Sequence, residues 1–392
     1  MLDQLLRGTE RVVTVGALKE RLGKDRPLRV KLGVDPTAPA ITLGWAVVLR
    51  KLRQFQEFGH TAVLIIGDFT AQVGDPSGKS ETRRRLSVEE VDGYADRILD
   101  DFATILLPEP LEVRRNSEWL ADLDMVKILE LTSQVTVAQM LERGDFAQRY
   151  QNQAPISLME FLYPLLQGMD SVAVEADVEL GGSDQLWNLM MGRVLQERAG
   201  QEAQIPFTMP LLIGTDGVHK MSQSLGNYIA IDDEPDDMFG KVMSIPDEQI
   251  VPYFELCTDL SSSEVAELAA GLSAGTLHPA NTKRRLARAI VDIYHDLGSG
   301  VAAERAFDQV FKEHRPPEVL PEFRLPAGDP VYLPAMLKSA GLVGSSSDAR
   351  RLIDQGGVKL DGETVNDLEL RRDVLQGATI QVGKRRFVKL LG

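Results

Sequence analysis

The stretch that decides the fold is residues 28–66, LRVKLGVDPTAPAITLGWAVVLRKLRQFQEFGHTAVLII. Residues 28–34 and 61–66 are short runs rich in β-branched side chains, and the second is apolar, as buried parallel strands are. Between them, Val48, Leu52 and Phe55 recur at helical spacing, and Gly59 marks the end of the helix. A strand, a helix and a strand at this spacing form a βαβ unit. The stretch therefore predicts an α/β fold with a doubly wound parallel sheet of the Rossmann type.

Polar motifs follow both strands. Ligands of open α/β sheets bind beyond the carboxyl ends of the strands, so DPTAPAITLGW (35–45) and GDFTAQVGDPSGK (67–79) are expected at the binding edge. The second motif is not a Walker phosphate loop, because three residues rather than four separate Gly74 from Gly78. Lys79 and the arginines after it fit either a basic loop over a phosphate or a solvated run of charge.

Composition limits the class of protein. A chain of 392 residues is expected to hold two to three domains. Its single cysteine excludes a disulfide framework, and it has neither a signal-peptide pattern nor an apolar run of about 18 residues. These features predict a cytoplasmic protein without a membrane partner. The net charge is −15, yet residues 331–392 hold ten Lys and Arg against seven Asp and Glu. Such a basic module on an acidic body suggests a local site for a polyanion.

The pattern of the chain changes three times. Residues 1–230 alternate strands with helices, and residues 231–311 turn to helical periodicity. Five prolines within residues 312–330 predict a semi-rigid linker, because proline density excludes helix and central strand. Residues 331–392 show a capped helix, a Gly-Gly stop and a hairpin turned at Asp361 and Gly362, which predicts a small α+β domain.

Three further motifs carry polar groups in arrangements suited to binding. YPLLQGMD places Tyr163, Gln167 and Asp170 on one helix face. GGSDQ sets a carboxylate and an amide on a turn suited to sugar hydroxyls, and HKMSQSLGN offers Lys220 and Ser222 on a loop suited to phosphate. Each motif taken singly is also compatible with a partly exposed polar surface.

In their order along the chain, these motifs resemble those of bacterial tyrosyl-tRNA synthetases, which are class I aminoacyl-tRNA synthetases. DPTAPAITLGWAVVLRKLRQFQ stands where that family has its HIGH signature, and KMSQS stands where it has KMSKS. GDPSGKSETR, EFLYPLLQGMDSV and ADVELGGSDQ also follow the family pattern. The segment ARRLIDQGGV…VGKRRFV resembles an RNA-binding domain shared with a small-subunit ribosomal protein.

The resemblance implies an architecture and an activity. Residues 1–230 would form the Rossmann-type catalytic domain, with an insertion near 115–165 that makes a homodimer interface. Residues 231–311 would form an α-helical anticodon-binding domain, and residues 331–392 an RNA-binding domain. The implied activity is that of a tyrosine–tRNA ligase, which forms tyrosyl-adenylate from tyrosine and ATP with Mg²⁺ and transfers the tyrosyl group to tRNA(Tyr). No tightly bound cofactor and no protein-bound metal are implied.

The resemblance also implies roles for individual residues. For catalysis they are Thr37, Thr42, Gly44, Trp45, Lys79, Lys220 and Gln223. For tyrosine they are Lys31, Asp75, Tyr163, Gln167, Asp170 and Gln185. For ATP they are Asp35, Thr37, Gly44, Gly182, Asp184, Lys220 and Ser222. For RNA they are Arg350, Arg351, Lys359, Lys384, Arg385 and Arg386.

The chain departs from the family pattern at its signatures. Thr42 and Trp45 occupy the places of the two HIGH histidines, and Gln223 occupies that of the second KMSKS lysine. Since the signature groups stabilise charge in the transition state, and the loss of one such donor costs about 2.7–4 kcal/mol, adenylation is expected to be slowed.

Other departures concern the surroundings of the expected site. Met169 replaces a tyrosine, and Leu186 and Trp187 stand where a basic residue and a phenylalanine are common. Two alternatives stay open on these grounds. One is a catalytically impaired paralogue that acts as an RNA-binding protein, and the other is an amino-acid-activating enzyme of altered specificity.

Overall fold

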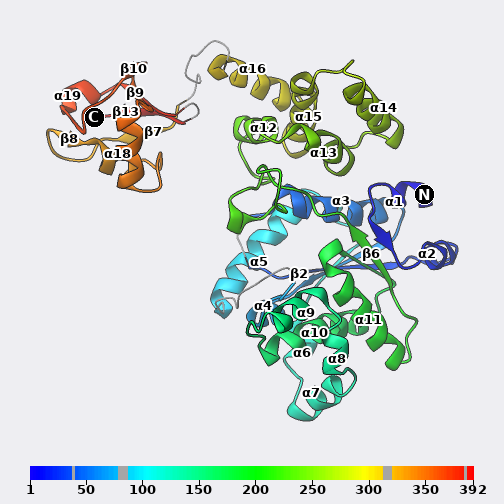
Figure 1. Cartoon of the computed structure of the whole chain (residues 1–392). Helices are drawn as coiled ribbons and strands as arrows, with labels where there is room; N and C mark the ends of the chain where they lie inside the picture. The colour runs from blue at the N-terminus through cyan, green and yellow to red at the C-terminus, as the bar shows by residue number, and fades with distance from the viewer. Residues whose placement is uncertain (38–39, 78–86, 312–319, 384–385) are drawn as a thin grey trace. The chain divides into compact units, whose positions relative to one another are not determined.

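The computed structural model describes residues 1–37, 40–77, 87–311, 320–383 and 386–392. The described part of the chain divides into two compact units, Met1–Asp296 and Leu297–Gly392 (Figure 1). Lys79, Lys384 and Arg385 lie outside the described residues, and so does the part of the expected linker at 312–319. Among the described residues, no helix is long and apolar enough to cross a membrane.

The first unit is built on a sheet of six strands within the described chain, in the order β1-β6-β5-β2-β3-β4. The strands are β1 (Arg11–Val12), β2 (Arg29–Val34), β3 (Thr61–Ile66), β4 (Leu111–Arg115), β5 (Val178–Gly182) and β6 (Ile205–Met209). All neighbours from β6 to β4 pair in parallel, while β1 adds to the edge in the antiparallel sense. The chain leaves β2 for β3 on one side and later returns to β5 on the other. The predicted doubly wound sheet is therefore confirmed, with its switch point at β2 and β5.

Helices cover both faces of this sheet, as Figure 1 shows. Helices α3 (Leu43–Glu57) and α5 (Val88–Ala103) lie on one face, and α10 (Leu158–Ala173) and α11 (Leu186–Arg198) on the other. Because both faces are covered, β2 and β3 are largely buried along their length. The predicted apolar stripe of α3, formed by Val48, Leu52 and Phe55, is buried, and the chain turns at Gly59 with a positive φ of 82°.

The first unit holds further helices, most of them short. They are α1 (Leu2–Leu6), α2 (Val15–Leu22), α4 (Thr70–Val73), α6 (Ser117–Leu120), α7 (Met125–Thr132), α8 (Val137–Met140), α9 (Gly144–Gln151), α12 (Pro235–Met243), α13 (Ile250–Cys257), α14 (Ser262–Ser273) and α15 (Pro279–Tyr294). Short 3₁₀ turns lie at η1 (Ser183–Gln185), η2 (Gln223–Leu225) and η3 (Asp247–Gln249). Helices α12 to α15 follow one another without an intervening strand, as the helical periodicity of this region predicts.

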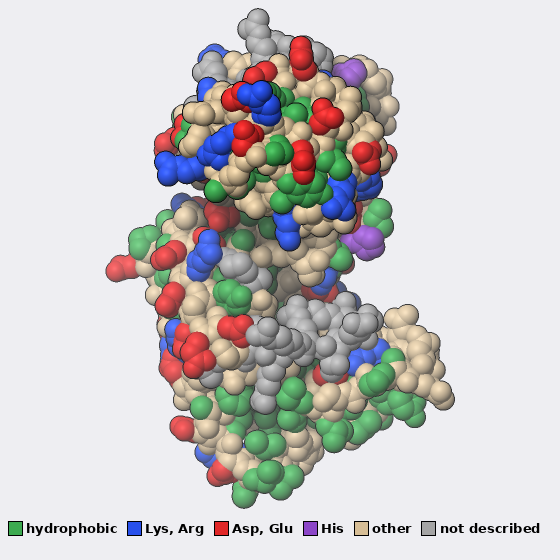
Figure 2. Space-filling view, turned by 90° about the vertical axis from the view of Figure 1, so that its left-hand side faces the viewer, with side chains coloured by type: hydrophobic (Ala, Val, Ile, Leu, Met, Phe, Trp, Pro, Cys, Tyr) green, Lys and Arg blue, Asp and Glu red, His purple; other side chains and the backbone are tan. Residues whose placement is uncertain are grey.

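Apolar side chains gather on the surface at one end of the first unit, where α7 lies (Figure 2). We call this the apolar patch. Its members are Met125, Val126 and Leu129 of α7, Val137 of α8 and Leu158 of α10, all of them more than half exposed. Such a gathering of exposed apolar side chains is unusual for a monomer.

The second unit holds α16 (Ser299–Phe311) and a small α+β fold. In its described residues, a sheet runs in the order β10-β9-β12-β13-β7, beside a pair β11-β8. The strands are β7 (Glu322–Arg324), β8 (Val331–Tyr332), β9 (Val358–Leu360), β10 (Glu363–Thr364), β11 (Glu369–Leu370), β12 (Thr379–Val382) and β13 (Arg386–Leu391). The helices are α17 (Leu333–Ser339), α18 (Ser346–Asp354) and α19 (Arg372–Leu375). The hairpin expected at Asp361 and Gly362 is present, with positive φ at both residues.

Part of the segment expected to be only a linker joins this sheet. Strand β7 pairs in parallel with β13, with Phe323 opposite Leu390. The prolines that flank it do not prevent this, because β7 is an edge strand and pairs on one side only. The expected domain boundaries at 230, 311 and 330 stay predictions.

Gly192 sets how closely α11 approaches the interior. A methyl group there would overlap the Gln204 amide and lie 3.0 Å from the Ser171 hydroxyl oxygen. We expect Gly192→Ala to lower the free energy of unfolding by about 1–3 kcal/mol through overpacking. Gly93→Ala in α5 is a matched control with no neighbour within 4 Å, and it should raise stability by up to about 1 kcal/mol. Urea unfolding measures both, and equal stability of the two variants would contradict this packing.

Candidate active site

The carboxyl ends of β2 and β3 meet the buried face of α10 at Asp35. The Tyr163 hydroxyl donates to Asp35 Oδ2 at 3.0 Å, and the Thr70 hydroxyl donates to Asp35 Oδ1 at 2.7 Å. Burial raises the pKa of Asp35 to about 7, and the charge of nearby Asp75 adds to the rise. Burial likewise raises the pKa of Tyr163 well above its usual value. At neutral pH the Tyr163 hydroxyl therefore keeps its proton and donates it to the Asp35 carboxyl group, which is partly protonated and partly ionised.

A second carboxylate lies on α10 at Asp170, about two turns after Tyr163. The Trp119 indole donates to Asp170 Oδ1 at 2.9 Å, and the Asn116 amide donates to Asp170 Oδ2 at 3.4 Å. Asn116 also donates to Thr70 Oγ1 at 2.9 Å, so a chain of hydrogen bonds joins Asp170 to the Asp35 group. Burial raises the pKa of Asp170 to about 7, and the charge of Lys31 opposes that rise. A buried carboxylate with spare lone pairs is an acceptor suited to a ligand hydroxyl.

Asn116 and Trp119 are site residues that the sequence analysis missed. They lie just after β4, at the same edge of the sheet as the two predicted motifs. The rule that places ligands beyond the carboxyl ends of parallel strands could have found them, had it been applied to the segment RRNSEWL (114–120).

A third group of predicted residues is brought together by the loop after α4 and the turn after β5. The Gln185 amide donates to Asp75 Oδ2 at 2.9 Å, and the backbone N–H of Ser77 donates to Asp75 Oδ1 at 2.8 Å. Gln167, one turn before Asp170, donates from its side-chain nitrogen to Glu179 Oε1 at 3.1 Å. Tyr163, Gln167 and Asp170 were predicted to share one face of α10. Each of these side chains has a polar hydrogen-bond partner.

Lys31 is enclosed in the interior rather than open to a ligand. Its side chain is 0% exposed, and its ammonium donates to Glu179 Oε1, to the Ser171 hydroxyl and to the carbonyl of Gln167, all within 2.9 Å. Every proton of the ammonium therefore has a protein acceptor. The sequence could have signalled this arrangement, because Glu179 is a charged residue inside the otherwise apolar strand β5.

The two signature segments contact each other. The Lys220 ammonium forms an ion pair with Asp184 at 2.7 Å, and the Gln223 amide donates to the carbonyl of Ala40. A methyl group placed on Gly44 would lie 3.6 Å from Met221 Cβ, which measures how near the second segment comes to the start of α3. The segment 219–227 therefore lies over the beginning of α3.

The other residues expected to bind ATP lie around this contact. The backbone N–H of Thr37 donates to the carbonyl of Asp35 at 2.8 Å. A side chain at Gly182 would meet both Asp184 Oδ1 and Leu211 at 2.8 Å, so only glycine fits there. The Ser222 hydroxyl lies 2.9 Å from that of Ser224.

The substituted signature residues differ in their surroundings. Thr42 is buried at the N-cap of α3, yet its hydroxyl makes no capping hydrogen bond. Trp45 is 37% exposed in the first turn of the same helix. Met169 packs into an apolar cluster with Leu165, Leu166 and neighbours, on a different face of α10 from Asp170. Its substitution therefore leaves the polar face of α10 unchanged.

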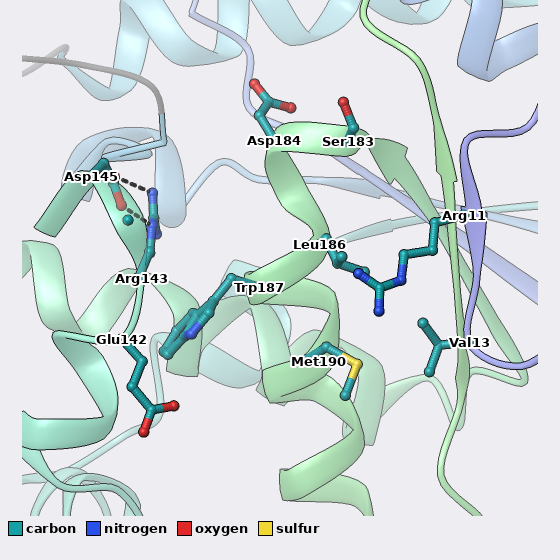
Figure 3. Close-up of a pocket in the computed structure, with 11 residues that line it drawn as sticks. Arg11, Val13, Glu142, Arg143, Asp145, Ser183, Asp184, Leu186, Trp187 and Met190 are labelled. Carbon is teal, nitrogen blue, oxygen red and sulfur yellow. Dashed lines mark hydrogen bonds and ion pairs between the residues drawn. The ribbon is translucent and has the colours of Figure 1, made fainter. Parts of the chain in front are cut away.

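A cavity of about 490 Å³ opens beside Asp184 (Figure 3). Its walls come from β1, the turn before α9, and the first turns of α11. The lining residues are Arg11, Val13, Glu142, Arg143, Gly144, Asp145, Ser183, Asp184, Leu186, Trp187 and Met190. Trp187 and Leu186, two of the departures from the family pattern, thus face a space next to the expected ribose ligand.

The residues expected to bind RNA that the structure describes lie in the second unit. Arg350 donates to the Tyr332 hydroxyl at 2.7 Å and lies over that ring, and Arg351 pairs with Asp348 at 3.2 Å. Arg386 donates to the carbonyl of Leu342, and Lys359 lies on β9. Among the described residues, no group of three or more His, Cys, Asp or Glu side chains is arranged to hold a metal ion.

Comparisons with known proteins agree with this architecture. Residues 23–312 match the family of tRNA synthetases class I (W and Y), and residues 333–371 match the S4 domain. The chain is 51% identical to the tyrosine–tRNA ligase of Moorella thermoacetica, over 98% of this chain and 94% of that protein. It is 49% identical to the tyrosine–tRNA ligase of Carboxydothermus hydrogenoformans, over 100% of this chain and 97% of that protein.

A solved structure shares the fold at lower identity. The tyrosyl-tRNA synthetase of Archaeoglobus fulgidus, complexed with L-tyrosine, superposes with a TM-score of 0.63 at 23% identity, over 77% of this chain and 98% of that one. The sequence match over the whole chain and the Rossmann-type sheet with its polar edge lead to one assignment. The chain belongs to the tyrosyl-tRNA synthetase family of class I tRNA synthetases and carries an S4 domain near its C-terminus.

Proposed function

We propose that this chain is a tyrosine–tRNA ligase, which activates tyrosine with ATP and transfers the tyrosyl group to tRNA(Tyr). The observation that carries the proposal is Asp170, a buried carboxylate held by Trp119 and Asn116 at the base of the polar face of α10. A site built around a buried acceptor rejects an amino acid that lacks the hydroxyl, because the acceptor would be left unpaired. Tyrosine satisfies it, and phenylalanine does not.

The proposal extends to the other end of the amino acid. Asp75, Tyr163 and Gln167 supply oxygen atoms along the face of α10 and the loop after α4, and an ammonium group needs such acceptors. Gln185, hydrogen-bonded to Asp75, lies near the tyrosine carboxylate in this arrangement. These residues hold the carboxylate toward the nucleotide side of the site.

The reaction has two steps. A carboxylate oxygen of tyrosine attacks the α-phosphorus of ATP, and pyrophosphate leaves with Mg²⁺ as its counter-ion. A ribose hydroxyl at the 3′ end of the tRNA then attacks the acyl carbon, and AMP leaves. Lys220 supplies positive charge to the phosphates, and Asp184 accepts from the ribose hydroxyls. Because these two side chains form an ion pair in the structure, ATP has to separate them as it binds.

Of the two alternatives, altered amino-acid specificity has the weaker support. Its basis was Met169, whose side chain packs into an apolar cluster rather than joining the polar residues of α10. The impaired paralogue retains a specific basis, because Thr42, Trp45 and Gln223 replace the charged or imidazole groups of the signatures. The expected compartment is the cytoplasm, where charged tRNA is used.

Restoring the signatures tests whether these substitutions limit the chemistry. We expect Thr42→His with Trp45→His to raise tyrosine-dependent ATP–pyrophosphate exchange by at least tenfold, since one preorganised donor is worth about 10²–10³ in rate. The dissociation constant for tyrosine should not change, because these side chains lie at the start of α3 and not on α10. Adding Gln223→Lys should give a further but non-additive gain. Unchanged exchange in the restored variants would show that other groups compensate, and no exchange in any variant would refute the proposed activity.

Tyrosine binding should depend on pH. A carboxyl group with a pKa of about 7 is mostly ionised at pH 8 and mostly protonated at pH 6. Since the ionised form is the stronger acceptor for the phenol, the dissociation constant for tyrosine should rise about tenfold between pH 8 and pH 6. Calorimetric titration measures this change. Asp170→Asn should bind tyrosine weakly at both values and lose the contribution of Asp170 to the pH dependence. An affinity independent of pH in the wild type would contradict the elevated pKa.

We further propose that the apolar patch forms the interface of a homodimer. It lies on α7, α8 and the start of α10, within the segment where the resemblance implies such an interface. Replacing an apolar side chain at a packed interface by a carboxylate buries an unpaired charge, which costs several kcal/mol.

A charge placed in the patch tests this assembly. We expect Leu129→Glu to shift sedimentation velocity from dimer to monomer at micromolar concentration. Val374→Glu is the control, because Val374 is a similarly exposed apolar residue in the other unit. A wild-type chain that sediments as a monomer, or a Leu129→Glu variant that remains dimeric, would rule out this interface.

A further inference from the structure

Glu179 lies in the interior directly beneath the face of α10 that carries Gln167. It is 1% exposed on β5, and in the parallel ladder it stands opposite Lys31 of β2. The two side chains form an ion pair at 2.9 Å. Neither residue belongs to the exposed part of the site, and no role follows for Glu179 from the family signatures.

Both oxygen atoms of Glu179 are fully engaged. Oε1 accepts from Lys31 at 2.9 Å and from the Gln167 side-chain amide at 3.1 Å. Oε2 accepts from the Ser171 hydroxyl at 3.0 Å and from the Gln204 amide. Gln204 also donates to the carbonyl of Leu189 at 3.1 Å, which anchors it to α11. The carboxylate of Glu179 on β5 thus links β2, α10 and, through Gln204, α11 by an ion pair and hydrogen bonds.

We propose that Glu179 is a positioning residue that fixes the orientation of the Gln167 amide, and through it the recognition of the amino group of the substrate. A glutamine side chain has a donor end and an acceptor end that are almost the same size. An ionised carboxylate can only accept, so Glu179 binds the NH₂ end of Gln167. The carbonyl end is then left to point away from Glu179, toward the site. An ammonium group can only donate, so this is the orientation that binds it.

Lys31 supports the arrangement in two ways. Its positive charge compensates the buried carboxylate, which would otherwise be costly to keep ionised. Its ammonium also donates to the main-chain carbonyl of Gln167 at 2.9 Å. The pair of Lys31 and Glu179 therefore holds both the backbone and the side chain of Gln167. This explains how Lys31 affects the site while its own side chain is enclosed.

The inference rests on the proposed function, in which Gln167 contacts the ammonium of tyrosine. A purely structural ion pair would have a different signature. Loss of structure weakens the binding of every ligand of the pocket, whereas loss of the amide orientation weakens only ligands that carry an ammonium group. A ligand pair that differs in that group separates the two roles.

The test compares tyrosine with 3-(4-hydroxyphenyl)propionate, which lacks only the amino group. In Lys31→Met with Glu179→Gln, either end of the new amide can face Gln167, because no ammonium holds its oxygen there, so the orientation is no longer imposed. We expect the dissociation constant for tyrosine to rise at least tenfold and that for the deamino compound to change less than twofold, by calorimetry with competition. In the exchange assay the KM for tyrosine should rise while the KM for ATP stays the same.

Two further variants serve as controls for a general loss of structure. Glu179→Gln alone keeps Lys31, whose ammonium holds the amide oxygen toward Gln167, so this variant should show no difference between the two ligands. Glu160→Gln is the matched control. Glu160 lies on α10 and, like Glu179, is a buried carboxylate in an ion pair, here with Arg149 at 2.5 Å. It is seven residues from Gln167 along the helix and forms no hydrogen bond with it. Glu160→Gln should lose stability without any difference between the two ligands.

Each other outcome overturns the inference in a distinguishable way. An equal loss for both ligands in Lys31→Met with Glu179→Gln would make the ion pair purely structural, and no loss for either would show that Gln167 keeps its orientation unaided. A wild-type chain that binds neither ligand would refute the proposed function itself, and the inference with it.

Discussion

The parallel pairing of β2 with β3 on one side and with β5 on the other is the constraint on which the site depends. It brings the ends of three strands to one edge of the sheet, where Asp35, the loop after α4 and the turn at η1 meet. The same pairing sets Lys31 opposite Glu179 inside the sheet. A shift of this register by one residue would turn one of the two side chains to the other face of the sheet and break the pair.

The interior of the site is unusually rich in carboxyl groups. Asp170 and Glu179 are withdrawn from water and Asp35 is partly so, and burial raises the pKa of Asp35 and of Asp170 to about 7. Each has donors directed at it: Tyr163 and Thr70 for Asp35, and the indole of Trp119 for Asp170. Such a cluster costs folding free energy, because desolvated charges repel one another. A ligand with one ammonium group and one hydroxyl offsets part of that cost, which matches the proposed substrate.

The two halves of the site differ in how far they keep the family pattern. On the side proposed for the amino acid, the predicted polar residues are present and each has a hydrogen-bond partner. On the nucleotide side, the segment with Lys220 and Gln223 lies over the start of α3, but Thr42 and Trp45 offer a hydroxyl and an indole where the family has imidazoles. Binding of the amino acid and the rate of its activation are therefore separable properties of this chain, since they depend on different groups.

The sequence alone determined the elements and the helix faces. The βαβ unit of residues 28–66, the hairpin at Asp361 and the shared face of Tyr163, Gln167 and Asp170 all follow from local periodicity and turn chemistry, which neighbouring residues fix. Tertiary structure decided which atoms meet. Trp119 reaches Asp170 from beyond β4, Glu179 reaches Gln167 from β5, and β7, within a proline-rich segment, joins the second sheet as its edge strand. These contacts depend on strand order and register between distant segments, and local periodicity carries no information about either.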